Sequence, residues 1–230
     1  MQVSFPEIFK MVLETLGMTL ISCTLAYLIG LPMGVLLNVT SKKGIMPCKW
    51  LNQILSLLIN ILRSIPCLIV VVLLMQTVRD IFGRAVGDWY TIIVPLFVTS
   101  FGFVSRMVEQ SLSEVDNGKI EAVASLGATK FQLITKVLLP EARASLVSGL
   151  AVTLVSILGY TSFAYNIGAG GLIAGIWQFY SKHTGSYLSE PFFWIMIIIV
   201  ILIVQGIQEL GLIISKKIDK RRILQWKKEF

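Results

Sequence analysis

Residues 118–142 read GKIEAVASLGATKFQLITKVLLPEA and form the longest polar interruption between the apolar runs of this 230-residue chain. Asp116 and Asn117, just before it, favour the start of a helix. Glu121 would lie in the first turn, where the helix dipole favours a negative charge, and Gly127 suits the helix end. The pattern therefore predicts a short helix that stops at Gly127.

A second helix is predicted over residues 130–139 of the same segment. Its apolar residues recur at a spacing that places them on one face: Phe131, Ile134, Val137 and Leu138. Pro140 has no N–H group to continue the helical hydrogen bonds, so we expect it to close this helix. Two helices joined at a glycine turn predict a folded loop over residues 109–142.

The composition indicates a membrane protein. The chain is 55% hydrophobic and 14% charged, whereas globular proteins average about 25% charged residues. We expect an all-α integral membrane protein with a single transmembrane domain over residues 1–230. The net charge of +7 does not indicate a nucleic-acid partner, because the basic residues collect beside the apolar runs and no basic-aromatic reader motif is present.

Five transmembrane helices are expected from the apolar runs. Their approximate ranges are 16–37, 51–78, 89–105, 144–165 and 191–215. The first run has 22 charge-free residues, enough to cross a hydrocarbon core of about 30 Å. Gly30, Pro32 and Gly34 near its end predict a close contact with another helix and a bend.

The distribution of lysine and arginine predicts the orientation. Fifteen of the 20 basic residues fall in the 41–50 loop, in residues 106–143 and in the 216–230 tail. Because basic residues favour the inner side, we expect a multi-pass cell-membrane protein with its N-terminus outside and its C-terminus in the cytoplasm. The 109–142 loop, between spans 3 and 4, would then be cytoplasmic, and the tail would lie against the anionic inner face.

Two interior sites are predicted to have a structural or gating role. The first is Arg63-Ser64-Ile65-Pro66 in the second span, where an arginine at membrane depth costs about 2.5 to 3.5 kcal/mol unless it faces protein, water or headgroups. The second is a glycine run that breaks the helix after span 4 and leads into a re-entrant or interfacial segment. The residues concerned are Arg63, Pro66, Gly168, Gly170 and Gly171.

The polar residues of the fourth span are candidates for the wall of a solute path. Three of them, Thr153, Ser156 and Tyr160, share a helical face by their spacing, and Thr161 and Ser162 follow directly. The alternative is ordinary hydrogen bonding of these side chains within the helical bundle, and the residues alone do not separate the two.

The loop resembles the EAA loop of permease subunits in binding-protein-dependent ABC importers. The resemblance is carried by Glu121-Ala122, by Gly127 and by Leu139-Pro140. It extends to residues 63–66, to Gly159-Tyr160 and to residues 168–172, which are similar in order to the methionine-import branch. Val123 and Val137 are mild departures, whereas others near the outer end of the path put the substrate in doubt: Phe163, Tyr165, Asn166 and Ile173.

The resemblance implies a set of partners. The loop would dock onto a cytoplasmic ATPase through Glu121, Ala122, Gly127, Ala128, Leu139 and Pro140. Two ATPase subunits would bind the ATP and Mg²⁺, and two permease copies, as a homodimer, would enclose the path. A substrate-binding protein or lipoprotein would deliver an amino acid.

Several chemistries are missing from the sequence. No Gly-x-x-x-x-Gly-Lys-Ser/Thr phosphate loop occurs, and no metal-ligand cluster or nucleophile-base pair is visible. His183 is the sole histidine and is expected in an outside loop. The carboxylates avoid the span centres, with Glu14 and Glu209 only near span ends, which disfavours a proton-coupled carrier. The chain is therefore expected to be no enzyme and to bind no cofactor of its own.

The sequence leads to one main hypothesis and two alternatives. The main hypothesis is the permease subunit of an ATP-driven importer of methionine or a related amino acid. A polar amino-acid permease subunit of the same superfamily is the first alternative. The second is a membrane scaffold that recruits an ATPase without transport, for which a large outside domain would be expected, although the outside loops are short.

Overall fold

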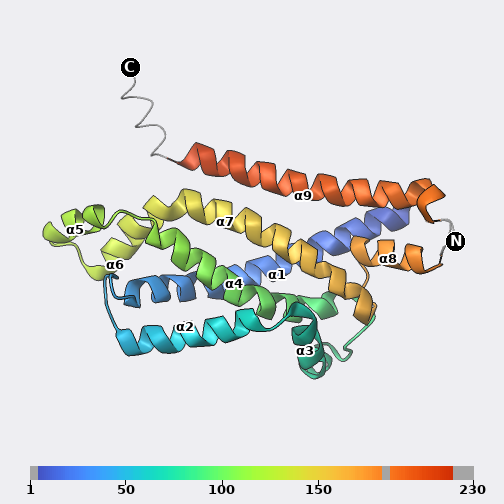
Figure 1. The fold of residues 1–230 in the computed structure, drawn as a ribbon, viewed down its shortest axis with the longest axis horizontal. Coiled ribbons are helices and arrows are strands. Elements are labelled where there is room, and N and C mark those ends of the chain that lie inside the picture. The colour runs from blue at the N-terminus through green and yellow to red at the C-terminus, as the bar shows by residue number, and fades with distance from the viewer. Residues whose placement is uncertain (1–4, 183–186, 220–230) are drawn as a thin grey trace, which may run out of the picture.

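The computed structural model describes residues 5–182 and 187–219, and over these residues it contains helices and connecting loops but no strand (Figure 1). The predicted residue His183 and most of the basic tail, residues 220–230, lie outside the described residues. The elements in chain order are α1 Phe5–Thr40, α2 Lys49–Ser64, α3 Cys67–Phe82, η1 Trp89–Ile92, α4 Ile93–Ser113, α5 Asn117–Ser125, α6 Lys130–Gln132, η2 Leu133–Leu138, α7 Leu139–Tyr160, η3 Thr161–Ile167, α8 Leu172–Lys182, η4 Tyr187–Ser189 and α9 Pro191–Ile218.

The expected all-α membrane architecture is confirmed. In the described part of the chain, four helices are long and apolar enough to cross a membrane: Phe5–Thr40, Trp89–Ser113, Lys130–Ile167 and Pro191–Ile218. The pair α2 and α3 passes the same test when taken together and is a candidate for a fifth span. The first helix also includes the N-terminal residues that precede the predicted first span, because Pro6 lies in the first turn, where proline is tolerated, and no other proline or glycine precedes Leu16.

The sequence suggested one continuous second span over residues 51–78. In the structure this segment is broken at Pro66. The axes of α2 and α3 differ by 99°. Ile65, directly before the proline, is extended with φ −83° and ψ 120°, because the proline ring disfavours the helical conformation of the preceding residue. Pro66 also has no N–H to donate. The break therefore turns the chain, and α3 points away from α2 (Figure 1).

The expectation that Pro140 closes a loop helix is wrong. The helix runs without a break from Lys130 to Ile167. Residues Leu133–Leu138 form π-helical turns, in which the N–H of Leu139 donates to the carbonyl of Ile134. The wider turn accommodates Pro140, whose ring would otherwise collide with the carbonyl of Lys136. The second half of the loop, from Lys130, and the fourth span are thus one continuous helix.

Helix α4 lies at the centre of the bundle and contacts α1, α2, α3 and α7. Its closest approach is to α1. A Cβ atom on Gly30 would lie 2.7 Å from Val104, and one on Gly34 would lie 2.6 Å from Val108 and from the carbonyl of Ser105. The predicted close contact at these glycines is confirmed. Such contacts matter in lipid, because tight packing rather than escape from water holds membrane helices together.

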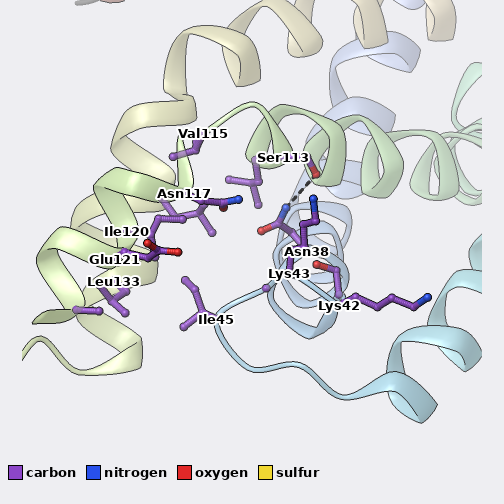
Figure 2. Close-up of a pocket in the computed structure, with 15 residues that line it drawn as sticks. Asn38, Lys42, Lys43, Ile45, Ser113, Val115, Asn117, Ile120, Glu121 and Leu133 are labelled. Carbon is purple, nitrogen blue, oxygen red and sulfur yellow. Dashed lines mark hydrogen bonds between the residues drawn. The ribbon is translucent and has the colours of Figure 1, made fainter.

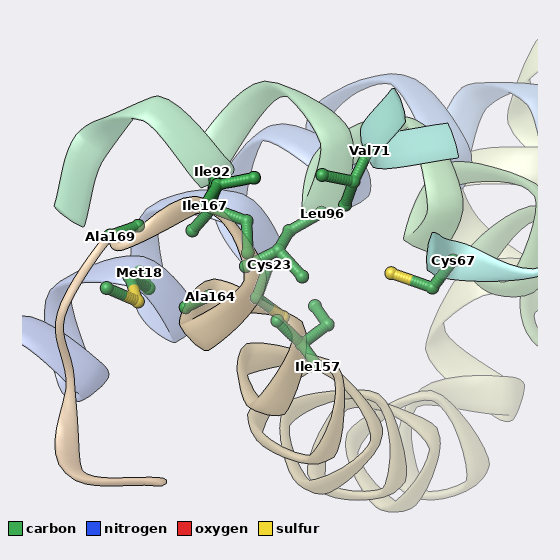
Figure 3. Packing of buried hydrophobic residues seen from close by; sticks show 10 residues of the cluster. All are labelled: Met18, Cys23, Cys67, Val71, Ile92, Leu96, Ile157, Ala164, Ile167 and Ala169. Atoms are coloured by element: carbon green, nitrogen blue, oxygen red, sulfur yellow. The ribbon is translucent and has the colours of Figure 1, made fainter. Parts of the chain in front are cut away.

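A buried cluster joins the helices on one side of the bundle (Figure 3). It brings together Met18 and Cys23 of α1, Leu96 of α4 and Ile157 of α7, with Ile167 of η3. These side chains come from three separate stretches of the chain, so they fix how the helices are arranged.

The two ends of the bundle differ. Helices α5 and α6 project from one end, which we call the loop end (Figure 1). Helix α8 and the first turns of α1 lie at the opposite end, which we call the far end. The predicted coupling loop and the predicted glycine break are therefore at opposite ends of the molecule.

Candidate functional site

The loop end is built from local capping interactions. Asp116 caps α5, where its side chain accepts a hydrogen bond from Gly118 N–H at 3.0 Å. Gly127 follows with φ +84°, a left-handed conformation that favours glycine. Thr129 and Gln132 then form a capping box, with Thr129 N–H donating to the Gln132 side chain at 2.9 Å. The sequence analysis missed this box, although Thr-x-x-Gln is its signature.

Most of the predicted coupling residues face the surroundings. Glu121, Ala122, Gly127 and Pro140 are exposed, and Ala128 and Leu139 are half-buried. The small side chains of Ala122 and Ala128, together with Gly127, leave room for another protein to approach the backbone closely between the two helices of the loop. This surface is open to a partner of matching shape.

Two large apolar side chains at the tip were not assigned a role by the sequence. Leu126 is 86% exposed and Phe131 is 74% exposed. Phe131 was expected on one helical face with Leu138, which is only 1% exposed. Leu138 packs against the bundle, whereas Phe131 lies in the short helix α6, which projects from it (Figure 1). Exposed apolar groups of this size at a tip are typical of a protein interface.

The base of the loop is fixed to the bundle. Leu138 belongs to a buried cluster with Val108, Leu112 and Val115, and Ile120 packs against it. An ion pair between Lys119 of α5 and Glu141 of α7 adds a polar connection, with 2.6 Å between Nζ and Oε2. A force on α5 can therefore be passed to α4 and to α7.

A groove of about 880 Å³ separates the loop from the end of α1 (Figure 2). Lys42 and Lys43 line one side, and Glu121, on α5, lines the other. Asn38 donates a hydrogen bond to Ser113 Oγ at 3.1 Å across its floor. The groove therefore has a basic and an acidic wall.

The predicted path residues are partly enclosed within this chain. Thr153 and Thr161 are buried, and their hydroxyls donate to the carbonyls of Gly149 at 2.8 Å and of Leu158 at 2.6 Å. Ser156 and Tyr160 are half-buried, as is Ser162, which follows Thr161. Ser156 donates to Val152 of its own helix at 2.9 Å. Ser156, Tyr160 and Ser162 therefore keep some surface that a solute could reach.

The predicted gating residues lie at two breaks. Arg63 and Pro66 are exposed at the bend between α2 and α3. Gly168, Gly170 and Gly171 have φ values of +63°, +76° and +88°, so this run forms a turn that other residues rarely adopt. The structure brings neither break into contact with the loop end.

No group of three or more metal-ligating side chains occurs in residues 5–182 and 187–219.

Comparison with known proteins gives a consistent result. Residues 26–220 match the family model described as binding-protein-dependent transport system inner membrane component. A relative from Pasteurella multocida, named probable D-methionine transport system permease protein MetI, is 37% identical over 220 residues, which cover 94% of this chain and 99% of the relative.

Two solved structures have the same fold. One, described as inward facing conformations of the MetNI methionine ABC transporter, has a TM-score of 0.86 and 36% identity and covers 94% of this chain and 99% of the matched chain. Another, described as an amino acid ABC transporter with histidines, has a TM-score of 0.73 and 21% identity, with coverage of 94% and 100%. At that identity the second likeness concerns the fold alone.

Proposed function

Because the chain belongs to the family of inner-membrane components of binding-protein-dependent transport systems, we propose that it is the permease subunit of an ATP-driven importer of methionine or a related amino acid. It is a multi-pass inner-membrane protein and a transport component rather than an enzyme. The methionine assignment is supported by the names of the relative and of the 36%-identical structure.

The observation that carries the proposal is the loop end. Helix α5 and the Gly127 turn expose a surface at the tip, while their base is tied to α4 and α7 by Leu138 and by the Lys119 to Glu141 ion pair. A partner that pushes on this tip would move the long helix that crosses the membrane. We assign ATPase coupling to Glu121, Ala122, Gly127, Ala128, Leu139 and Pro140.

The proposal includes a set of partners. Two ATPase subunits bind ATP and Mg²⁺ and dock on the loop ends of two permease copies. The loop end then faces the cytoplasm, together with the C-terminus, and the far end and N-terminus face outward, where a binding protein or lipoprotein delivers the amino acid. Closure of the ATPase dimer drives the two copies from inward-facing to outward-facing, and hydrolysis resets them.

The solute path between the two copies would use the half-buried polar groups of α7 and η3. Ser156, Tyr160 and Ser162 are the candidates that retain exposed surface, whereas Thr153 and Thr161 would act by shaping the helix. Arg63, Pro66 and the glycine run at Gly168, Gly170 and Gly171 would shape or gate the path at their two breaks.

Transport assays test the substrate. In proteoliposomes with the cognate ATPase and receptor, methionine uptake should require both ATP and the receptor. Uptake of basic or amide amino acids alone would favour the polar amino-acid permease instead. Uptake that needs ATP but no receptor would contradict the importer mechanism.

Co-purification tests the coupling surface. An ATPase should be recovered with the wild-type chain and lost with Gly127→Asp, which places a side chain on the left-handed turn. Recovery of an ATPase without any transport activity would favour the scaffold alternative. Absence of an ATPase from both preparations would overturn the proposed function.

A further inference from the structure

The first turn of α8 is capped by side chains from α1, far away in the sequence. Gly171 N–H donates to Glu14 Oε2 at 3.0 Å, and Leu172 N–H donates to Thr15 Oγ1 at 2.7 Å, in both cases across 157 residues. The first N–H groups of a helix have no partner within the helix, and a carboxylate there also meets the positive end of the helix dipole. Two neighbouring residues of α1 thus satisfy two successive N–H groups of α8.

Glycine is required for this contact. A Cβ atom on Gly170 would lie 2.6 Å from Glu14 Oε2, and one on Gly171 would lie 3.1 Å from Thr15 Oγ1. Both glycines also have positive φ. A turn further along α8, a Cβ atom on Gly175 would lie 2.6 Å from Met11 Sδ. The backbone of the segment therefore rests directly on α1 (Figure 1).

The carboxylate of Glu14 is held in a partly closed position. Its side chain is 16% exposed, and Lys10 Nζ lies 3.8 Å from its other oxygen. Beside it is a pocket of about 420 Å³, also lined by Tyr165 and Gln178. A largely buried carboxylate at the edge of a membrane helix is costly unless it has partners. Here the partners of the carboxylate are the Gly171 N–H group and one exposed lysine, of which the N–H group is better shielded from water.

We propose that Glu14 is a positioning residue for transport, which with Thr15 makes α1 and the segment from Gly168 to Lys182 move as one body. This inference rests on the proposed function, because it takes the far end as the outer end of the solute path. The segment follows the candidate path residues directly, so its position decides whether that end of the path is open. Fixing it to α1 makes opening follow the movement of the whole bundle.

Substitutions test the two hydrogen bonds in the assembled transporter. Thr15→Val removes the acceptor for Leu172 and also the donor to Met11, whereas the matched control Thr24→Val removes only a donor to its own helix, at Leu20. We expect Thr15→Val and Glu14→Ala to lower methionine transported per ATP hydrolysed by roughly three- to tenfold. Thr24→Val should leave the amount of methionine transported per ATP hydrolysed unchanged. Thr15→Ser, which keeps the hydroxyl group, should retain the wild-type value.

A purely structural role predicts a different result. Transport and ATP hydrolysis would then fall together, in proportion to the amount of complex assembled, and this would overturn the proposal. Unchanged coupling in both variants would overturn it as well. Failure of the proposed function is distinguishable, because the wild type would then show no receptor-dependent transport.

Cross-linking tests whether the two parts stay together. Met11→Cys with Gly175→Cys, in a Cys48→Ser background, places a thiol near the position of Met11 Cγ, which lies 3.9 Å from where a Cβ atom on Gly175 would be. The oxidised pair should transport as well as the reduced pair. Loss of transport on oxidation and recovery on reduction would show that α8 must leave α1, and the proposal would be wrong.

Discussion

Glycine is required at two groups of positions in this chain, for a different physical reason in each group. Gly127 and Gly83 have positive φ and open space where a Cβ atom would be. At these positions the backbone conformation alone selects glycine. Gly30 and Gly34 lie in a regular helix, where α4 leaves no room for a side chain. At these positions the neighbouring helix selects glycine.

Gly127→Ala should weaken the ATPase interaction. The left-handed conformation costs an alanine about 1 to 2 kcal/mol, which corresponds to roughly five- to thirtyfold in the dissociation constant if the turn relaxes in the free chain. The measurement is binding of the purified ATPase to the permease in detergent. Gly83→Ala is the matched control and should leave ATPase binding unchanged. Gly127→Asn should weaken ATPase binding less than Gly127→Ala does, because asparagine tolerates the left-handed conformation. Equal binding by wild type and Gly127→Ala would contradict the assigned role.

Gly34→Ala should destabilise the bundle. The new methyl group would meet Val108 and the Ser105 carbonyl, and such overpacking costs about 1 to 3 kcal/mol. The measurement is thermal unfolding in detergent. Gly206→Ala in α9, where a Cβ atom would meet nothing within 4 Å, serves as control and should be neutral or slightly stabilising. Similar melting temperatures for Gly34→Ala and wild type would argue against close α1 to α4 packing.

Among the elements, the helix from Lys130 to Ile167 connects the two ends of the molecule. It carries the second half of the loop, the candidate path residues and the 3₁₀ turn before the glycine break. The π-helical turns at Leu133–Leu138 set the rotation of the loop relative to the membrane span. Movement at the tip is therefore transmitted along a continuous helix.

Pro140→Ala should weaken coupling without lowering stability. Alanine restores an N–H that can bond to the carbonyl of Lys136, which favours an ordinary α-helix by about 3 kcal/mol at most. A regular helix would rotate the Gly127 turn about α7. We expect an equal or higher melting temperature with lower ATPase stimulation. Pro32→Ala, inside α1, is the control and should leave stimulation unchanged. Higher stability with full stimulation would show that the π-helical turns have no role in coupling.

The two charges of the ion pair between α5 and α7 should be interchangeable between the helices. Lys119 and Glu141 have side chains 46% and 33% exposed, and exposed pairs contribute about 0.2 to 1 kcal/mol. Lys119→Glu or Glu141→Lys alone should weaken ATPase binding by a few-fold at low salt, and the double reversal should restore it. The measurement is a double-mutant cycle on the dissociation constant. Additive losses in the double variant would mean that the two residues act independently.

For the whole molecule, the uneven exposure of the helices suggests what surrounds them. Helix α4 is largely enclosed, whereas Met196 and Gly211 are the buried residues of α9. Large apolar side chains on α9 therefore face outward, among them Ile198, Leu202 and Leu210. Lipid or a second copy of the chain would cover them.

The orientation can be tested with the native cysteines. Cys48 is exposed beside the loop end, whereas Cys23 and Cys67 are buried. A membrane-impermeant thiol reagent should label Cys48 in inside-out vesicles but not in intact spheroplasts. Val86→Cys, in the loop after α3 and 48% exposed in the wild type, should show the opposite pattern in a Cys48→Ser background. Labelling of Cys48 from outside would reverse the assigned topology.

The sequence predicted much of this arrangement because the relevant signals are local. Long apolar runs indicated the membrane helices, and Asp116 and Gly127 indicated the two ends of the first loop helix. The prediction that Glu121 lies in the first turn of that helix is wrong, because the helix begins at Asn117 and Glu121 is its fifth residue. The contact at Gly30 and Gly34 was also predicted correctly. The sequence was less informative about which side of a membrane helix is buried. Lipid is as apolar as the protein interior, so the periodic pattern of apolar residues is weak. For this reason Thr153 and Thr161 could not be placed from spacing alone.

The sequence by itself determined the membrane class, the approximate positions of the spans and the glycine turn of the loop, since each depends on residues close together in the chain. The tertiary structure decided how two prolines act. Pro66 breaks its span and turns the chain, whereas Pro140 is accommodated in a continuous helix by a wider turn. It also joined Glu14 to Gly171 across 157 residues. A proline is compatible with either outcome, so the sequence did not separate them, and the contact between Glu14 and Gly171 forms only when the helices pack together.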